Sequence, residues 1–347
     1  MKEKRTKKVG VGVVGLGFMG VTHINAYQKI QDAEIVAVCD AVRIPENGNL
    51  KIDGNIGAGT TLKLDFTKIK AYRDYSEMLK NPDVELVDIC VPTAAHPEIA
   101  IAAMESGKDV VCEKPMARTS ELAQKMVEVS KRTGKILMPA MCIRFWPEWS
   151  FLKSAKSNQE FGKLLALRIR RVSQPPGWSK GTYSDGGKSG GALLDLHIHD
   201  TDFVQFIFGK PKAVYSTGFP FFSGAIDHIV TQYDFGNDLV VWAEGSWAMT
   251  EGFGFNMSYT AIFENATVDY DSSRGKDALK LYERGKQPQT IATSDEDGYV
   301  GELKYIVNCI LNGGKPSIVT AEDGATAIKI CEAEERSVYS KEKIMLY

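Results

Sequence analysis

The feature that most constrains the fold of this chain is a glycine-rich turn near its amino terminus, GLGFMG at residues 15–20. The turn follows VGVGVV (9–14), a β-branched run that predicts a short buried strand, and it precedes THINAYQKI (22–30), which predicts a helix. By themselves the three glycines are weak evidence for ligand binding, because a turn of this kind can be purely structural. The next predicted strand, AEIVAVCD (33–40), ends in an aspartate. A G-x-G-x-x-G turn in this context, with a carboxylate about 20 residues later, is typical of dinucleotide-binding βαβ units.

The residues of this turn have separate predicted roles. Gly15 permits the tight turn, Gly17 lets the backbone approach a pyrophosphate, and Gly20 lets the helix pack closely on the strand. Phe18 and Met19 lie within the turn, before the predicted helix, whose amino end favours a phosphate group. We therefore predict that these five residues line a bound dinucleotide.

The aspartate at the end of the second strand bears on which dinucleotide is bound. Asp40 is placed to accept hydrogen bonds from the adenosine ribose hydroxyls. A carboxylate there repels a 2'-phosphate, so we expect NAD, with NADP less favoured. Arg43, three residues later, weakens this preference without reversing it.

Strands and helices continue to alternate as far as residue 142. The predicted strands VELVDICVP (84–92), DVVCEKP (109–115) and KILMPAM (135–141) are separated by helical segments, which indicates a parallel sheet with right-handed crossovers. Between them and the second strand, residues 41–70 are polar and rich in glycine, so we predict an inserted loop with room for a hairpin. Residues 1–142 therefore form a predicted Rossmann NAD-binding domain.

The pattern changes after residue 142. A helix that begins in WPEWSFLKSAKS (146–157) is followed by successive strand-like segments joined by turns such as FGND (235–238) and FENA (263–266), and two helices close the chain. Residues 143–347 therefore predict a carboxy-terminal α+β domain with a mostly antiparallel open sheet, for substrate binding and oligomerisation. The fold class is α/β, with a Rossmann domain followed by this second domain.

Charge and cysteine usage restrict the partners. The 347 residues carry a formal charge of -2, which argues against a dominant nucleic-acid or membrane surface and favours a small molecule. Six scattered cysteines without a C-x-x-C pair indicate reduced thiols of a cytoplasmic protein. The basic start MKEKRTKK before an apolar run imitates an export signal, but the glycines of that run argue against one.

Several further segments carry a family resemblance. VPTAAHPEIAIAAMESGKDVVCEKPMA (91–117), RFWP (144–147) and SGGALLDLHIHDTDF (189–203), together with GLGFMG, resemble the glucose-fructose oxidoreductase/inositol dehydrogenase family (Gfo/Idh/MocA) over nearly the whole chain. The most specific elements are EKP at 113–115 and the D-x-x-x-H from Asp195 to His199. The 41–70 loop is longer than we expect for this family, and Leu196 and His197 stand where many members carry a glycine before the histidine, which points to a subgroup with its own substrate.

The resemblance implies an NAD(P)-dependent dehydrogenase or reductase that transfers hydride between nicotinamide and a secondary alcohol or carbonyl of a sugar, polyol or related carbohydrate. It assigns residues to three groups: catalytic Lys114, Asp195 and His199; cofactor-binding Val91, Pro92, Thr93, His96, Glu113 and Lys114; and Arg144 facing the substrate. Independently of the resemblance, a neutral histidine suits removal of a hydroxyl proton at pH 7, and a nearby ammonium stabilises an alkoxide-like transition state. No metal ligand set is expected.

The segment GGALLDLHIHD (190–200) has two conformational interpretations. As a helix it places Asp195 and His199 one turn apart on a common face, with His197 directed elsewhere. As a strand it places Asp195, His197 and His199 on one face, which would suit a metal-dependent hydrolase. Two non-catalytic interpretations also stay open: a purely structural pair of side chains, and an NAD-binding sensor or repressor. His23 and His228 are interpreted as local hydrogen-bonding residues.

Two further expectations concern partners. Trp178, Tyr183 and Lys188 precede the Asp195 segment, where they can stack on or bond to a carbohydrate, and Trp178 is the residue that we predict to contact the substrate. The apolar strands AVYSTGFPFF (213–222) and FGFNMSY (253–259) predict self-association as a homodimer or homotetramer.

Overall fold

The computed structural model describes residues 8–52, 60–177, 181 and 183–347, and the chain divides into two units. The first unit joins Met1–Cys142 to Asp297–Ala325, and the second joins Ile143–Glu296 to Thr326–Tyr347. The late segment Asp297–Ala325 thus returns to the amino-terminal unit.

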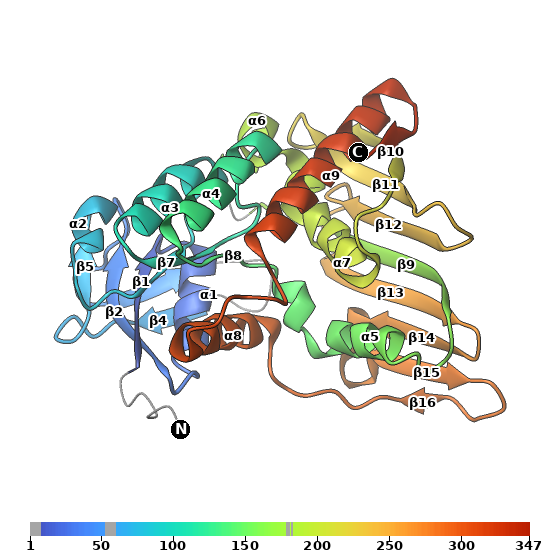
Figure 1. The fold of residues 1–347 in the computed structure, drawn as a ribbon, viewed down its shortest axis with the longest axis horizontal. Coiled ribbons are helices and arrows are strands. Elements are labelled where there is room, and N and C mark those ends of the chain that lie inside the picture. Colours follow the sequence, from blue (N-terminus) through green and yellow to red (C-terminus); the bar gives the residue numbers. More distant parts are fainter. Residues whose placement is uncertain (1–7, 53–59, 178–180, 182) are drawn as a thin grey trace. The chain divides into compact units, whose positions relative to one another are not determined.

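The first unit contains a parallel six-stranded sheet in the order β5-β2-β1-β6-β7-β8 (Figure 1). Every residue of β1 and β6 is buried, so both strands are continuous apolar runs, interrupted only by Asp88. The strand order reverses between β1 and β6, and open sheets of this kind bind ligands beyond the carboxyl ends of the strands at such a point. The strands are β1 (Val9–Val14), β2 (Ala33–Cys39), β5 (Lys70–Tyr72), β6 (Leu86–Ile89), β7 (Asp109–Cys112) and β8 (Leu137–Pro139).

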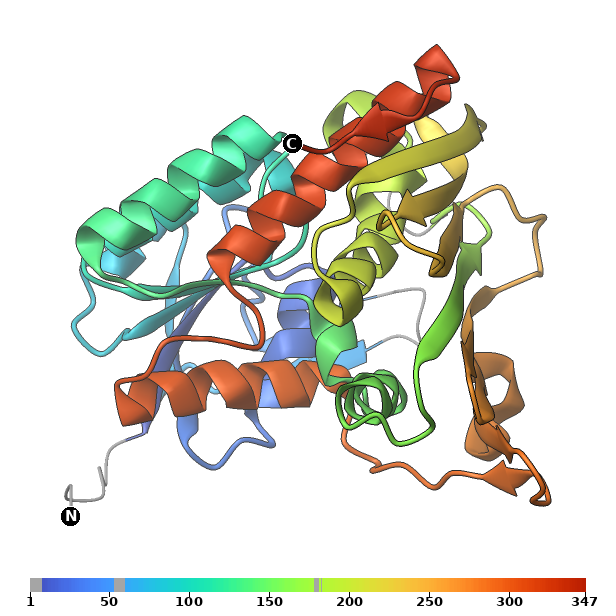
Figure 2. The same cartoon turned by 45° about the vertical axis from the view of Figure 1, so that its right-hand side comes forward.

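Helices cover both faces of this sheet. Figures 1 and 2 show α3 and α4 on one face, with α1 and α8 packed together on the other. Within the predicted 41–70 loop the structure has an antiparallel pair, β3 (Asn49–Ile52) and β4 (Thr60–Lys63). The helices are α1 (Phe18–Tyr27), α2 (Tyr75–Leu79), η1 (Thr93–Ala95), α3 (His96–Glu105), α4 (Ser120–Thr133) and α8 (Gly298–Asn312).

The second unit contains a nine-stranded sheet in the order β16-β15-β14-β13-β9-β12-β11-β10-β17. Its neighbours pair antiparallel except β9 and β12, which run parallel, so the predicted mostly antiparallel sheet is confirmed. The strands are β9 (Leu164–Ser173), β10 (Ala213–Pro220), β11 (Ile226–Asp234), β12 (Val240–Ser246), β13 (Phe255–Phe263), β14 (Ala266–Asp271), β15 (Leu279–Glu283), β16 (Gln289–Thr290) and β17 (Ile344–Met345).

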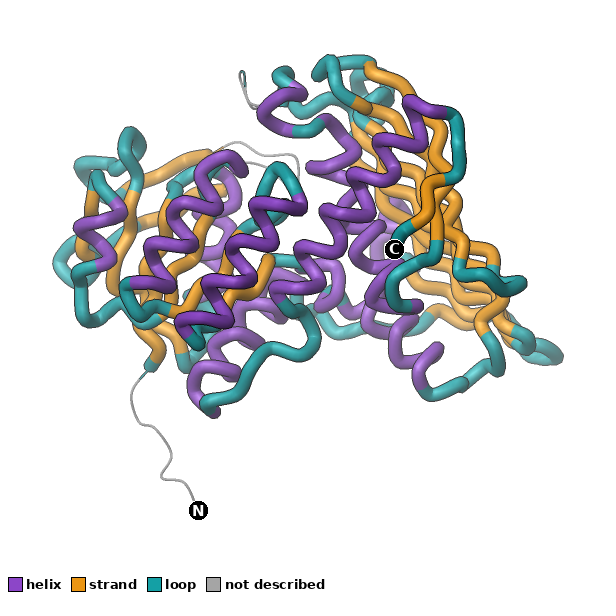
Figure 3. Tube along the Cα trace, turned by 45° about the horizontal axis from the view of Figure 1, so that its top comes forward, coloured by secondary structure: helices purple, strands orange, loops and turns teal. Residues whose placement is uncertain are grey.

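The helices of the second unit gather on one face of its sheet, as Figure 3 shows. Strand residues on the other side stay open to solvent, among them Tyr215, Phe219, Val240 and Ile262, which are 41–49% exposed. The helical elements are η2 (Cys142–Phe145), α5 (Pro147–Ser157), α6 (Gly186–Ser189), the π-helical turn η3 (Leu193–His197), α7 (Ile198–Phe208), η4 (Ser272–Asp277) and α9 (Ala321–Ser340), which begins in the first unit. Within the described ranges, no helix has the length and apolar character needed to span a membrane.

Candidate active site

Four predicted site segments follow four strands of the first unit at the same edge of the sheet. Gly15 directly follows β1 and Asp40 directly follows β2, whereas one residue separates Val91 from the end of β6 and Lys114 from the end of β7. Since these strands are parallel neighbours, their carboxyl ends lie together. The topology therefore brings the predicted cofactor residues to one edge, around the point where the strand order reverses.

The glycine turn leaves room for an anion at the start of α1. Gly15 has a φ of +99°, and a Cβ on it would lie 2.5 Å from the carbonyl oxygen of Cys90. A Cβ on Gly20 would overlap the carbonyl oxygen of Gly15. Gly17 is the N-cap of α1 and has no side chain to cap the helix. The atom nearest to a Cβ built on Gly17 is Arg43 Nη1, at 3.3 Å. A pyrophosphate at the uncapped amino end of α1 fits this geometry.

Asp40 fixes the backbone around the turn. Its Oδ2 accepts a hydrogen bond from the backbone N–H of Leu16 at 2.8 Å. Its Oδ1 accepts from the N–H groups of Val42 and Arg43 at 2.9 and 2.7 Å. The carboxylate is only partly buried, and its contact with the ribose hydroxyls stays a prediction.

His96 joins two of the edge segments. The ring is buried, with Nδ1 2.9 Å from the Pro115 carbonyl oxygen and Nε2 2.8 Å from the Val91 carbonyl oxygen. Burial lowers the pKa of His96, so the neutral ring donates to one of these two carbonyls. His96 thus lies between the segment 91–93 and the EKP segment, and its direct contact with cofactor stays a prediction.

The EKP segment continues from the end of β7. The bond between Lys114 and Pro115 is cis. Lys114 is partly exposed, and its backbone N–H donates to Glu113 Oε2 at 3.0 Å. The Glu113 side chain is buried, with Oε1 3.1 Å from His23 Nε2, and its contact with cofactor stays a prediction.

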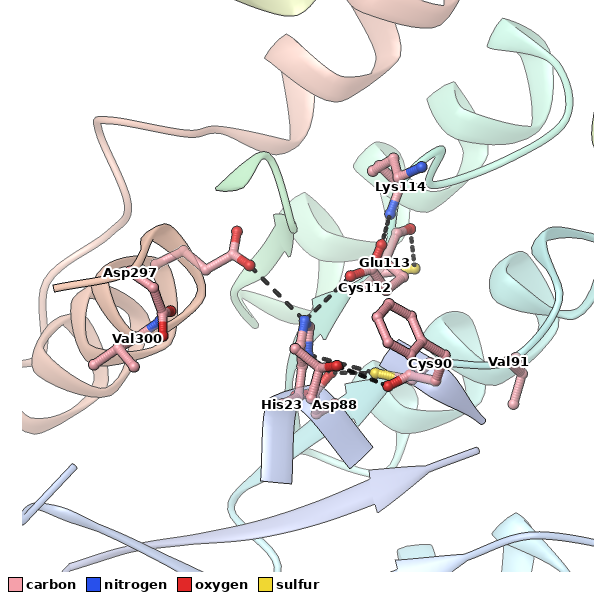
Figure 4. A network of polar contacts seen from close by, with 12 residues as sticks. His23, Asp88, Cys90, Val91, Cys112, Glu113, Lys114, Asp297 and Val300 are labelled. Atoms are coloured by element: carbon pink, nitrogen blue, oxygen red, sulfur yellow. Dashed lines mark hydrogen bonds and ion pairs between the residues drawn. The ribbon is translucent and has the colours of Figure 1, made fainter. Parts of the chain in front are cut away.

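Sequence reasoning missed the buried polar network around His23, which Figure 4 shows. His23 Nδ1 lies 2.9 and 3.1 Å from the two carboxylate oxygens of Asp88, and Cys90 Sγ lies 3.4 Å from Nδ1. Glu302 Oε1 of α8 is 3.8 Å from His23 Nε2. The signal in the sequence is Asp88 itself, a carboxylate in the middle of an apolar strand.

The pKa directions of this network follow from burial and charge. Burial by itself lowers the pKa of His23, but Asp88 and the hydrogen bonds of the ring outweigh it and raise the pKa well above its usual value. Burial by itself raises the pKa of Glu113, but His23 and Lys114 outweigh it and lower that pKa. Burial raises the pKa of Glu302 well above its usual value, so this carboxyl group is neutral.

Residues 193–208 of the second unit are helical, through η3 and α7. The helical interpretation of the Asp195 segment is confirmed, and the strand interpretation, on which the metal-dependent hydrolase depended, is wrong. From Gly191 to Asp200 every residue is buried except Asp195 and His199, which are partly exposed. The apolar residues of the segment therefore anchor it in the unit, while its two predicted catalytic side chains reach the surface.

His197 points into the core. Its Nε2 is 3.3 Å from the Tyr233 hydroxyl and 3.7 Å from Glu334 Oε1, and the ring is fully buried. Burial by itself lowers the pKa of His197, but the Glu334 carboxylate outweighs it and raises the pKa. A Cβ on Gly245 of β12 would lie 2.7 Å from the His197 Cβ, so the strand backbone comes close to this ring.

The predicted substrate residues differ in position. Arg144 is buried and forms a bidentate ion pair with Asp202, with Nε–Oδ2 and Nη2–Oδ1 distances of 2.8 and 2.6 Å. Trp178 lies outside the described residues. Tyr183 packs edge-on against Trp247, with ring centroids 5.5 Å apart.

One group of metal-ligating side chains converges within the described ranges: His23, Asp88 and Cys90. Their donor atoms are hydrogen-bonded directly to one another. Asp195, His197 and His199 belong to the other unit.

Comparisons with known proteins agree with this architecture. The sequence matches the model of an oxidoreductase family with an NAD-binding Rossmann fold over residues 9–141 and the model of the Gfo/Idh/MocA C-terminal domain over 149–269. Myo-inositol 2-dehydrogenase of Thermotoga maritima is 26% identical over 347 residues, which cover 97% of this chain and 98% of the relative. The scyllo-inositol 2-dehydrogenase (NAD+) of Bacillus subtilis is 25% identical, with 93% and 92% of the two chains covered.

Solved structures show the same fold. A levoglucosan dehydrogenase in complex with NADH and levoglucosan superimposes with a TM-score of 0.82 at 21% identity, and the match covers 98% of this chain and 99% of the other. The family models together span both parts of the chain. With the glycine turn at the edge of a parallel sheet and an antiparallel sheet later in the sequence, this chain belongs to the Gfo/Idh/MocA family of NAD-binding oxidoreductases.

Proposed function

We propose that this protein is an NAD-dependent dehydrogenase that transfers hydride between nicotinamide and a secondary alcohol or carbonyl of a cyclic polyol or sugar. The observation that carries the proposal is the exposure pattern of residues 191–200, where Asp195 and His199 alone reach the surface of a buried helix. A structural pair would lie inside the core, as His197 does, with its Nε2 in contact with Tyr233 and Glu334. Cofactor binding is assigned to the first unit, and substrate binding and assembly to the second.

Each residue has a proposed role at one substrate hydroxyl. His199, in its neutral form, removes the hydroxyl proton. Lys114 stabilises the negative charge that develops on the oxygen, since an ammonium is the natural partner of an alkoxide-like group. Asp195, one helical turn from His199, accepts hydrogen bonds from the substrate. When bound, the nicotinamide supplies the hydride acceptor.

The cofactor proposal is NAD in preference to NADP. It is supported by the Asp40 carboxylate, which is fixed beside the glycine turn by three backbone hydrogen bonds. A second negative charge from a 2'-phosphate would be placed against it. Titration with NADH and NADPH tests this, and tighter binding of NADPH would overturn the assignment of Asp40 to the ribose.

The substrate class is inferred from the relatives, whose names include dehydrogenases of myo-inositol, scyllo-inositol and levoglucosan. The test is a panel of these three compounds and common aldoses with NAD+, followed by the absorbance of the reduced cofactor. We expect turnover of at least one cyclic polyol or sugar. No turnover across the panel, with intact NADH binding, would favour a sensor over an enzyme.

Three variants test the roles. His199→Ala and Lys114→Ala should each retain NADH binding and lose about two to four orders of magnitude in kcat. The double variant should be little worse than either, because residues that act as one unit are not additive. His197→Ala is the matched control: it should lower the melting temperature, because it leaves Glu334 buried without its cation, and change kcat only a few-fold.

The open face of the nine-stranded sheet supports self-association. Its exposed aromatic and β-branched side chains, such as Tyr215 and Phe219, form the kind of apolar surface that subunits bury against each other. We propose a homodimer or homotetramer assembled through this face.

A further inference from the structure

A series of buried polar contacts connects the backbone N–H of Lys114 to the interior of the first unit. Glu113 Oε2 accepts a hydrogen bond from the Lys114 N–H at 3.0 Å, and Glu113 Oε1 lies 3.1 Å from His23 Nε2. On the other side of the ring, Nδ1 lies 2.9 Å from Asp88 Oδ2. Figure 4 shows this sequence of contacts from Asp88 through His23 and Glu113 to Lys114.

The geometry defines the protonation of the ring. A carboxylate only accepts hydrogen bonds, and His23 has a carboxylate at each ring nitrogen. The hydrogen bond from Nδ1 to Asp88 and the ion-pair distance from Nε2 to Glu113 both favour a proton on each nitrogen, so we assign His23 as an imidazolium. The raised pKa of His23 agrees with this assignment.

The groups that face His23 come from every element packed around it. Tyr27 comes from α1, Asp88 and Cys90 from β6 and the residue after it, Glu113 from the end of β7, and Tyr299 and Glu302 from α8. Burial raises the pKa of Tyr27, Cys90, Tyr299 and Glu302, so these four are neutral. The charges that remain are one imidazolium and the carboxylates of Asp88 and Glu113.

This arrangement leaves one surplus negative charge under the EKP segment. The Lys114 ammonium acts on Glu113 and, together with His23, lowers its pKa. A buried set of ions is a costly way to fill a core, and well-packed apolar residues of similar size are often as stable. Here the Glu113 carboxylate accepts a hydrogen bond from the Lys114 backbone N–H, so it fixes this peptide and also provides a negative charge close to it.

We propose that His23 is a positioning residue for Lys114: its charged ring holds the Glu113 carboxylate through the 3.1 Å ion pair at Nε2. This inference rests on the proposed role of Lys114 in the reaction. His23 contacts neither substrate nor cofactor in this assignment. It sets the orientation of Glu113, and Glu113 sets the peptide from which the lysine side chain departs.

Two neutral variants of similar size distinguish the contact at Nδ1 from the contact at Nε2. His23→Gln places an amide N–H near the position of Nε2 and keeps a donor for Glu113. His23→Asn places its amide near the position of Nδ1, keeps a donor for Asp88 and leaves Glu113 without one. Each variant removes the charge and leaves one buried carboxylate unpaired, so each is the control for the other in stability. Melting temperature and NADH affinity establish that both variants are folded.

The first readout needs no substrate. The native protein and both variants are treated with acetic anhydride, and the acetylation rate of Lys114 relative to the exposed Lys68 is measured by mass spectrometry. In His23→Asn the released Glu113 carboxylate pairs with the Lys114 ammonium, so acetylation of Lys114 should slow by about threefold or more. In His23→Gln the rate should stay within about twofold of the native rate. Equal slowing in both variants, or none in either, would overturn the assignment.

The second readout is turnover of myo-inositol with NAD+. His23→Asn should lower kcat by about 10- to 100-fold with little change in KM, because misplacing a catalytic group by about 1 Å has an effect of this size. His23→Gln should lower kcat less than about fivefold. Adding Glu113→Gln to His23→Asn should have little further effect, since both changes break the same contact. A folded His23→Asn protein with native kcat would overturn the proposal. If the native protein is inactive on every panel compound, the proposed function is refuted instead, and the acetylation rates alone decide the role of His23.

Discussion

Replacing Arg144 with methionine tests whether this arginine is held as a buried ion pair. Arg144 and Asp202 expose only 2% and 1% of their side chains, and two short hydrogen bonds join them. Gln205 also donates to Asp202, and the Arg144 guanidinium lies 4.6 Å from the centre of the Phe206 ring. Arg144→Met therefore leaves a carboxylate buried without its cation, and this change typically costs about 3–5 kcal/mol.

The expected melting-temperature change follows from this loss. A domain of about 150–250 residues shifts by about 2–4 °C per kcal/mol, so Arg144→Met should lower the melting temperature by about 6–20 °C. The double variant Arg144→Met/Asp202→Leu removes both charges and should recover most of the loss, because an apolar pair of similar volume avoids the desolvation of two ions. Urea unfolding followed by circular dichroism gives the same comparison as free energies.

Two outcomes would refute this reasoning. One is a loss of less than about 1 kcal/mol in Arg144→Met, which is the range of a solvent-exposed pair. The other is a double variant no more stable than the single one. The stable double variant also isolates the predicted substrate contact of Arg144: a raised KM for the panel substrate would support it, and an unchanged KM would restrict Arg144 to the ion pair.

Three further predictions concern other parts of the molecule. The pKa of Glu302 has its usual value of 4.5 in the unfolded chain and is raised in the folded protein, so this group makes the native state less stable as the pH rises above about 4.5. The gain in melting temperature from Glu302→Gln should therefore grow between about pH 5 and pH 8. A gain that does not change with pH would contradict a neutral Glu302. Gly20→Ala should abolish NADH binding or folding, because its Cβ overlaps the Gly15 carbonyl, and native-like NADH titration would be incompatible with that packing. Phe219→Asp, at a residue 47% exposed on β10, should shift sedimentation at micromolar concentration to a smaller species, and a native protein that is already monomeric removes the proposed assembly.

Much of the fold could be predicted because its signals are local. The apolar runs that end in Asp40, Cys90 and Cys112 have the length of buried parallel strands, and the glycine turn fixes how the first strand meets its helix. The parallel pairing of β9 with β12 could not be predicted, since turn residues identify hairpins between consecutive strands but not the partner of a distant strand.

The helical placement of two candidate residues, Asp195 and His199, could be predicted because their spacing fits one face of a helix, and both are partly exposed in a buried segment. The network of His23 could not be predicted, because its partners Asp88, Glu113 and Glu302 come from three distant segments and meet only after the sheet and α8 have formed. The sequence alone favours a local hydrogen-bonding role for His23, whereas every charged contact described for it is long-range.

The return of Asp297–Ala325 to the first unit has a consequence for how the protein is made. While the ribosome is still translating residues 143–296, the nascent amino-terminal region has its six strands but lacks α8, which packs on α1 and β1. The apolar side of α1 and the polar cluster beneath Lys114 then stay open until about 300 residues have been polymerised, because Glu302 belongs to the missing helix. The amino-terminal region therefore exposes part of its core for longer than its own length requires, and a genetic fusion or truncation that stops at residue 142 removes a piece of that core.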